Sequence, residues 1–259
     1  MRNMKRYLSL AGLAVITALS ASCEKNGVQD ITAAPAASRV RFFNFGVNAP
    51  GVNFYANDTK MTAVTSATGV ESTNGVAYGS VGANGNYDGI APGQYTLTGK
   101  IAATVDKDLA ISSVSAAIAD GKWYSYYQSG FYNTAAKTVD AFVVEDPVPT
   151  PDFSVAYVRF VNAISNSSPM VLSAKNTTTA AVTALGAAVA YKSAGAFTSL
   201  APGFYDLSAR VPGAATDAIV RTGVSFVGGR VYSISARGDI TVTSTTATNR
   251  PFLDNTANW

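Results

Sequence analysis

Hydrophobic and polar residues alternate in two short segments that nearly repeat each other. In residues 93–99, Tyr95 and Leu97 alternate with polar neighbours, and residues 203–209 follow the same order. Strict alternation is typical of a β-strand with one face on a core and the other in water. A Pro-Gly pair introduces each segment and favours a tight turn. The pattern therefore predicts two equivalent β-strands, each entered through a turn.

Two other segments are apolar on both faces. They read "VRFFNF" over residues 40–45 and "VRFVNA" over residues 158–163, which is typical of central strands. Asn-Gly pairs at 74–75 and 84–85 are hairpin signals. Residues 177–196 are rich in Thr and Val and are expected to form a loop and a strand rather than a helix. Short strands with frequent turns predict an all-β protein of the β-sandwich type.

The matched segments recur in the same order along the chain. Their spacings shrink from 118 to 113, 110 and 108 positions (Arg41 to Arg159, Val76 to Val189, Pro92 to Pro202, Gly121 to Gly229). A period above 100 residues is too long for a solenoid repeat. We therefore predict two tandem immunoglobulin-like β-sandwich domains, at residues 38–145 and 154–259. The proline-rich segment 146–153 is expected to be a semi-rigid linker between them.

The N-terminus has the features of an export signal. Arg2, Lys5 and Arg6 precede an apolar run at residues 8–19 that is too short to span a bilayer. Without these three cations, 16 of the 19 Lys and Arg residues remain against 16 Asp and Glu, so the mature chain is formally neutral. This balance gives no reason to expect a nucleic-acid partner.

Cys23 is the only cysteine in the chain and cannot form an internal disulfide. It ends the segment "LSASC", which resembles a bacterial lipobox in which the cysteine is acylated. We therefore predict a signal peptide at 1–22, a lipidated Cys23 and a flexible tether over 23–37. The alternative is ordinary secretion with a free thiol. A palmitate-type anchor predicts an outer-membrane lipoprotein of a Gram-negative bacterium, on the periplasmic or the surface-exposed face.

The strand and turn motifs also resemble a known family. The segments "RVRFFNFGVNAPGVNFYAN" (39–57), "GVAYG" (75–79), "IAPGQYTLTG" (90–99) and "ADGKWYSYYQSG" (119–130) are similar to a bacterial domain-of-unknown-function family, the 4397 type. That family recurs in tandem in surface lipoproteins. The resemblance covers residues 38–145 and, more loosely, 155–240. It implies a β-sandwich and supplies no catalytic residues.

The composition excludes most common kinds of catalytic site. The chain has no histidine, which excludes Ser-His-Asp and Cys-His arrangements and histidine-based zinc sites. The segment "NGNYDG" (84–89) has too few acidic ligands for calcium. We therefore predict no enzyme activity, no cofactor and no metal. The one remaining route is glycoside hydrolysis by two facing acids. Its candidates lie in or beside the first repeat, most of them in predicted turns: Asp88, Asp106, Asp108, Asp120, Asp140, Glu145 and Asp146.

One group of aromatic residues is a candidate binding site. In residues 123–127, Tyr124 and Tyr126 match Tyr232 and Ile234 of the second repeat and are expected to face the core. The opposite face would carry the aromatic side chains that the second repeat lacks, and Phe131 and Tyr132 follow closely. The ligand-binding candidates are therefore Trp123, Tyr127, Phe131 and Tyr132. The alternative is that Trp123 and Tyr127 fill a sandwich interior or the contact between the two domains.

Three functions fit these observations. The first is a non-enzymatic, lipid-anchored envelope protein that acts as a binding or scaffold module for a glycan or protein ligand, with the membrane as its other partner. The second is a pilus subunit that assembles by strand donation, in which residues 24–45 would include a removable strand. The third is a carboxylate-based glycoside hydrolase or a carbohydrate-binding accessory protein.

Overall fold

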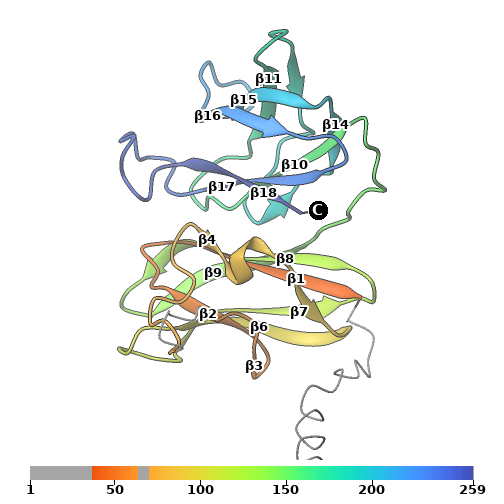
Figure 1. Cartoon of the computed structure of the whole chain (residues 1–259). Coiled ribbons are helices and arrows are strands. Elements are labelled where there is room, and N and C mark those ends of the chain that lie inside the picture. The colour runs from red at the N-terminus through yellow and green to blue at the C-terminus, as the bar shows by residue number, and fades with distance from the viewer. Residues whose placement is uncertain (1–36, 64–69, 259) are drawn as a thin grey trace, which may run out of the picture. The chain divides into compact units, whose positions relative to one another are not determined.

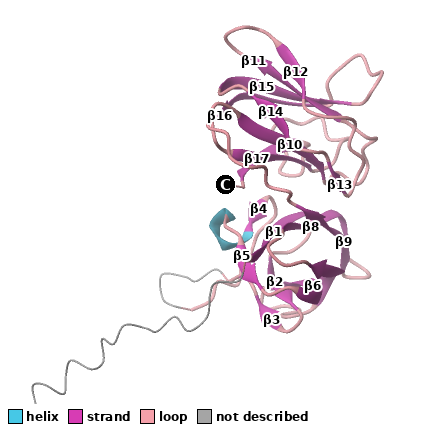
Figure 2. Ribbon diagram, turned by 90° about the vertical axis from the view of Figure 1, so that its right-hand side faces the viewer, coloured by secondary structure: helices cyan, strands magenta, loops and turns pink. Residues whose placement is uncertain are grey.

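The computed structural model describes residues 37–63 and 70–258. All described strands belong to one compact unit, Ala36–Trp259. The predicted signal peptide, Cys23 and most of the tether lie outside the described residues. Within the described ranges the chain is all-β apart from the short 3-10 turn η2 (Gly82–Gly85), and no helix there is long and apolar enough to cross a membrane (Figure 2).

The N-terminal strand set (β1–β9) forms two sheets (Figure 1). The first has the order β4 (Ser80–Val81), β1 (Ser38–Val47), β8 (Trp123–Asn133) and β9 (Thr138–Glu145), and β5 (Asp88–Ile90) also pairs with β1. The second has the order β3 (Thr59–Lys60), β2 (Val52–Ala56), β6 (Gly93–Ile101) and β7 (Ala110–Ile118).

The C-terminal strand set (β10–β18) repeats this plan. One sheet has the order β13 (Ser193–Ala194), β10 (Ala156–Asn162), β17 (Val231–Arg237) and β18 (Phe252–Ala257), and β14 (Thr198–Leu200) also pairs with β10. The other has the order β12 (Val182–Ala184), β11 (Val171–Asn176), β15 (Gly203–Arg210) and β16 (Ile219–Phe226). Residues 177–196 form loops and short strands, as predicted.

The strand registers repeat with the sequence. In both sets one parallel pairing, β1 with β8 and β10 with β17, joins strands that otherwise pair antiparallel. Arg41 pairs with Ser125 in the first set and Arg159 with Ser233 in the second. Gly93 and Gly203 begin equivalent strands with the same φ of 156°, and the chain bends at the preceding prolines, Pro92 and Pro202.

Each strand set has its own hydrophobic cluster between its two sheets. In the N-terminal set Leu97 is fully buried and Gln94 is exposed, which confirms the predicted alternation in β6. Phe42 of one sheet stacks on Phe54 of the other, with ring centroids 5.1 Å apart. Tyr126 contacts both rings from β8. Burying such aromatic area supplies most of the favourable free energy of folding.

A third hydrophobic cluster joins the two strand sets. It contains Phe43, Phe45, Tyr127 and Phe142 from the N-terminal set together with Val161 and Ala163 from the C-terminal set. The five-stranded sheet of each set therefore faces the other set (Figure 1). This contact explains why the sequences of β1 and β10 are apolar on both faces, because one face packs inside its own set and the other covers the neighbouring set.

Candidate functional site

The structure does not gather the four predicted aromatic residues into one exposed surface. Trp123 and Phe131 lie eight residues apart along β8, which is about 26 Å at the usual rise per residue. Phe131 is 44% exposed, and Tyr132 packs against the hydrophobic cluster of its own set. Trp123 is half-buried near the start of the strand. Ligand binding by these three side chains stays a prediction.

Tyr127 points away from the core of its own strand set, as the alternation predicts, but it is not exposed. Its side chain is fully buried, and its ring stacks between Phe43 and Phe142 at centroid distances of 4.4 and 5.0 Å. Its hydroxyl group lies 3.2 Å from that of Ser235 in the C-terminal strand set. Tyr127 thus belongs to the contact between the two sets, which was the alternative interpretation. The outward face of β8 is not free because the other five-stranded sheet covers it.

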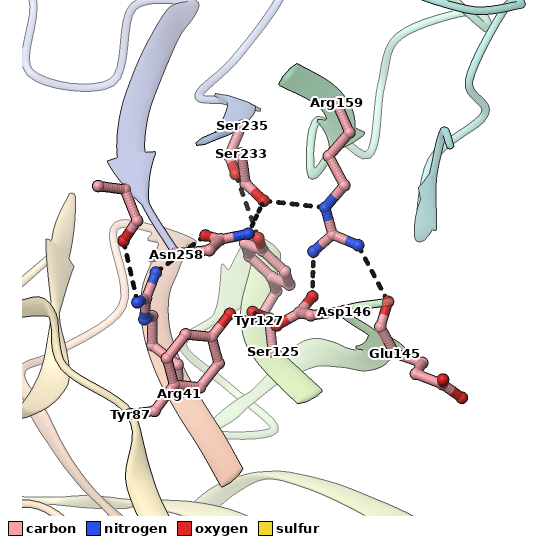
Figure 3. A network of polar contacts seen from close by, with 11 residues as sticks. Arg41, Tyr87, Ser125, Tyr127, Glu145, Asp146, Arg159, Ser233, Ser235 and Asn258 are labelled. Atoms are coloured by element: carbon pink, nitrogen blue, oxygen red, sulfur yellow. Dashed lines mark hydrogen bonds and ion pairs between the residues drawn. The ribbon is translucent and has the colours of Figure 1, made fainter. Parts of the chain in front are cut away.

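A buried ion pair lies beside this contact (Figure 3). Arg159 and Asp146 are 1% and 2% exposed, and Nη2 of Arg159 donates to Oδ1 of Asp146. Arg159 also donates to the carbonyl oxygen of Glu145 at 2.9 Å and to the hydroxyl of Ser233 at 2.8 Å. The guanidinium group therefore has acceptors on all three of its nitrogens.

The carboxylate of Asp146 is equally well supplied with partners. Its Oδ2 accepts hydrogen bonds from the hydroxyl of Ser125 at 2.7 Å and from that of Tyr87 at 2.6 Å. Burial and the adjacent Asp146 charge raise the pKa of Tyr87 well above its ordinary value, so this phenol stays a neutral donor. A buried ion pair needs such complete hydrogen bonding to offset its desolvation.

A second buried arginine is bound only by neutral groups. Arg41 is 2% exposed and donates to Oδ1 of Asn258 at 3.1 Å and to the carbonyl oxygen of Ala257 at 3.0 Å (Figure 3). Its guanidinium carbon lies 3.8 Å from the centre of the Tyr87 ring. Its Nε has no hydrogen-bond partner, and burial lowers the pKa of the group. No carboxylate of the described residues forms an ion pair with Arg41.

The two arginines occupy equivalent places in a twofold-like junction. Residues 41 and 159 match at the spacing of 118, and the strand registers match Asp146 with Asn258. Arg41 therefore reaches into the C-terminal set just as Arg159 reaches into the N-terminal set. Tyr127 and Ser235 are also equivalent positions, and they meet each other. Reciprocal contacts of this kind are the signature of a self-complementary interface.

The two ends of the junction differ in charge. At one end Asp146 pairs with Arg159, and Glu145 pairs with Lys122 at 3.1 Å. At the other end the positions of Glu145 and Asp146 are occupied by Ala257 and Asn258, and the position of Lys122 by Arg230. The equivalent positions thus carry cations in both repeats, whereas only the first repeat carries the two carboxylates.

A shallow pocket of about 580 Å³ opens beside Arg41 and Asn258, and its lining residue Tyr87 donates a hydrogen bond to Asp146. The Tyr87 and Trp123 rings in its wall have centroids 4.8 Å apart. Arg39 is half-buried and Arg230 is exposed, and neither forms an ion pair with a described residue. This arginine pocket is the candidate functional site, and its chemistry suits an anion. Its principal lining residues are Arg39, Arg41, Tyr87, Trp123, Arg230 and Asn258.

Sequence reasoning identified Trp123 but missed the arginines. Arg41 and Arg159 stand at the same place in two apolar segments, where a charged residue is out of keeping with its neighbours. This repeated charged residue in an apolar segment could have predicted a buried arginine with specific partners. The partners themselves lie 13 and 217 positions away along the chain, beyond any local pattern.

Ion pairs occupy several of the carboxylates considered for catalysis. Asp106 pairs with Lys137 at 2.7 Å and Asp140 with Lys192 at 3.0 Å, in addition to the pairs of Glu145 and Asp146. Within the described ranges there is no group of three or more His, Cys, Asp or Glu side chains that could hold a metal.

Asp88 differs from these acids because its carboxyl group is partly buried without a cation. Burial raises the pKa of Asp88 to about 6, and its Oδ2 has no hydrogen-bond partner. The folded state therefore holds this proton more tightly than the unfolded state, so its contribution to stability falls as pH rises from about 4 to about 6. We expect Asp88→Asn to gain stability relative to the parent protein over this range. Urea unfolding at a series of pH values measures the difference.

The exposed Asp120→Asn is the matched control for this measurement. A difference between Asp88→Asn and the parent that stays constant from pH 4 to pH 7 would contradict the interpretation.

Fold and site together define an all-β protein of paired sheets with an arginine-lined pocket at the junction of its two strand sets. The chain belongs to the DUF4397 family, a domain of unknown function, whose family model matches residues 38–173. The match covers the whole N-terminal strand set, β10 and the start of β11.

Solved structures that resemble the chain include one with low sequence identity. A "putative cell adhesion protein" from Bacteroides fragilis NCTC 9343 is 9% identical in sequence, and the alignment covers 85% of this chain and 97% of that chain. The TM-score is 0.22, which is too low to support any argument about fold or function. No curated protein matches the chain.

Proposed function

We propose that this protein is a non-enzymatic, lipid-anchored binding module of the cell envelope. The observation that carries the proposal is the arginine pocket, where cations and aromatic rings meet in an open hollow. Such a concave site with a few convergent polar groups is the usual form of a ligand site. The absence of histidine from the chain and the ion pairs of its acids favour binding over catalysis.

We further propose that the two strand sets are tandem immunoglobulin-like β-sandwich domains, at residues 38–145 and 154–259. The repeated registers and the separate hydrophobic cluster of each set support this division. Segment 146–153 would join them. Its first residue, Asp146, is buried in the ion pair with Arg159, so the connection is fixed at one end. A ligand at the junction would then contact both domains.

The anchor of the proposed module is Cys23, at the end of a tether that begins directly after the signal peptide. We expect Cys23→Ala to move the protein from the membrane fraction to the soluble fraction, because each buried acyl methylene contributes about 0.8 kcal/mol to membrane binding. Mass spectrometry of the mature N-terminus checks the acylation. An unmodified Cys23 in a membrane-free parent protein would contradict the prediction.

Binding itself is tested by screening the purified chain against glycan and protein arrays. Trp123→Ala is the site variant, because Trp123 lines the pocket, and Phe204→Ala, an exposed aromatic residue of β15 outside the pocket lining, is the control. We expect a ligand whose binding is lost in Trp123→Ala and kept in Phe204→Ala. A ligand bound equally by both folded variants would place the site elsewhere, and the absence of any ligand would contradict the proposed function.

The strand-donation alternative requires the first strand to leave the fold. β1 pairs along both edges, with β4 and β5 on one side and β8 on the other. Its side chains also contribute to two hydrophobic clusters, through Val40 and Phe42 in one and Phe43 and Phe45 in the other. These contacts favour β1 as a permanent part of the fold, and we therefore give precedence to the binding module.

A further inference from the structure

The arginine pocket holds an excess of positive charge. Arg39, Arg41 and Arg230 line it, and no carboxylate of the described residues forms an ion pair with any of them. Arg41 is the decisive group, because it is buried and its Nε has no hydrogen-bond partner. No carboxylate of the described residues binds Arg41 directly, although Asp146 lies near enough to act on its charge, and an anion that entered the pocket would offset part of the remaining desolvation cost.

Comparison with Arg159, the equivalent residue of the second repeat, shows which partner Arg41 lacks. There Arg159 and Lys122, the equivalents of Arg41 and Arg230, have Asp146 and Glu145 as partners. The equivalent of Tyr87 is Phe197, whose ring centre lies 4.8 Å from the guanidinium carbon of Arg159. The cation and the ring are thus present at both ends. Asp146 therefore supplies the anion next to Arg159, whereas only the neutral groups of Ala257 and Asn258 bind Arg41.

We propose that the arginine pocket binds a carboxylate-bearing sugar, such as a uronic acid residue of a glycan. The inference rests on the proposed binding function and names the ligand class of the same site. The ligand carboxylate would lie in the pocket next to Arg41 and Asn258, the neutral equivalent of Asp146. Arg39 and Arg230 bind it from the rim, where charge-assisted hydrogen bonds to a guanidinium group are strong and directional.

The aromatic rings favour a sugar over a simple anion. Tyr87 and Trp123 form adjacent faces in the pocket wall, and Tyr87 is held in place by its hydrogen bond to Asp146 and by the guanidinium group over its ring. A fixed aromatic face offers contact area at little conformational cost, which suits the apolar face of a pyranose ring. An acidic peptide would use the guanidinium groups but gain less from these rings.

The test measures binding of glucuronate to the purified full chain by isothermal titration calorimetry. Glucose is the neutral control, and an acetylated, amidated aspartate is the peptide-type control. We expect glucuronate to bind and both controls to fail. Asn258→Asp places a carboxylate beside Arg41 from within the chain, so it is expected to raise the melting temperature and to weaken glucuronate binding about tenfold or more. Asn133→Asp, at the exposed end of β8, is its charge-matched control.

A second variant leaves the buried network intact. Arg39→Gln combined with Arg230→Gln removes the rim cations, and we expect it to weaken glucuronate binding without loss of folding. Equal binding of glucose would overturn the carboxylate assignment while leaving a sugar-binding function. Binding of the aspartate probe alone would overturn the sugar assignment. Unchanged glucuronate binding in both variants would overturn the site. If none of the three probes binds, the ligand class is wrong, and the array screen decides separately whether the binding function stands.

Discussion

Asp146→Ala is expected to lower the free energy of unfolding by about 3–5 kcal/mol, because it leaves Arg159 buried without its counter-ion. Removal of the carboxylate also leaves the hydroxyl groups of Ser125 and Tyr87 without the acceptor to which both donate. Chemical denaturation monitored by the fluorescence of the chain measures the change. Few single substitutions in this protein should have a larger effect, because the side chain is 2% exposed and makes three polar contacts.

Glu145→Ala is the matched control, one position earlier in the chain. The Glu145 side chain is 43% exposed in its pair with Lys122, and such surface pairs contribute less than about 1 kcal/mol. Replacing both buried partners, as in Asp146→Ala with Arg159→Met, should recover part of the loss because no charge is then left buried. If Asp146→Ala proved as mild as Glu145→Ala, the ion pair would not be a structural element of the junction.

Tyr127→Ala is expected to cost about 3–5 kcal/mol, as is usual when a large buried aromatic side chain is truncated. Tyr127 fills the centre of the cluster between the two strand sets, stacked between Phe43 and Phe142. The substitution therefore opens a cavity at the junction that the surrounding sheets can close only in part. Equilibrium unfolding in urea, compared with the parent protein, gives the difference.

Phe131→Ala serves as the control on the same strand, because Phe131 is exposed and should change stability by less than about 0.5 kcal/mol. Tyr127→Phe keeps the ring and removes only the contact with Ser235, which is expected to cost about 0.5–1.5 kcal/mol. A stable Tyr127→Ala protein that had lost ligand binding would instead make Tyr127 a binding residue, as the sequence first suggested.

Local patterns along the chain are enough to predict the strands and their repetition. Alternation in residues 93–99, the two apolar central segments and the Pro-Gly pairs are local signals, and the structure has strands and bends at those places. The inward direction of Tyr124 and Tyr126 could also be predicted, because the second repeat keeps apolar residues at both positions. These features depend on neighbours within a few residues, which is why a pattern along the chain is enough.

The packing of the two strand sets determines what covers each sheet face and which charged groups meet. Alternation assigns Tyr127 to the outer face of its sheet, but it carries no information about the second sheet that buries that face. Arg41 finds Asn258, 217 positions away, and the same fold gives Arg159 a carboxylate that Arg41 lacks. Pairing at such separations depends on how two complete strand sets pack together, and the free energy of that packing is spread over many residues rather than encoded in any one segment.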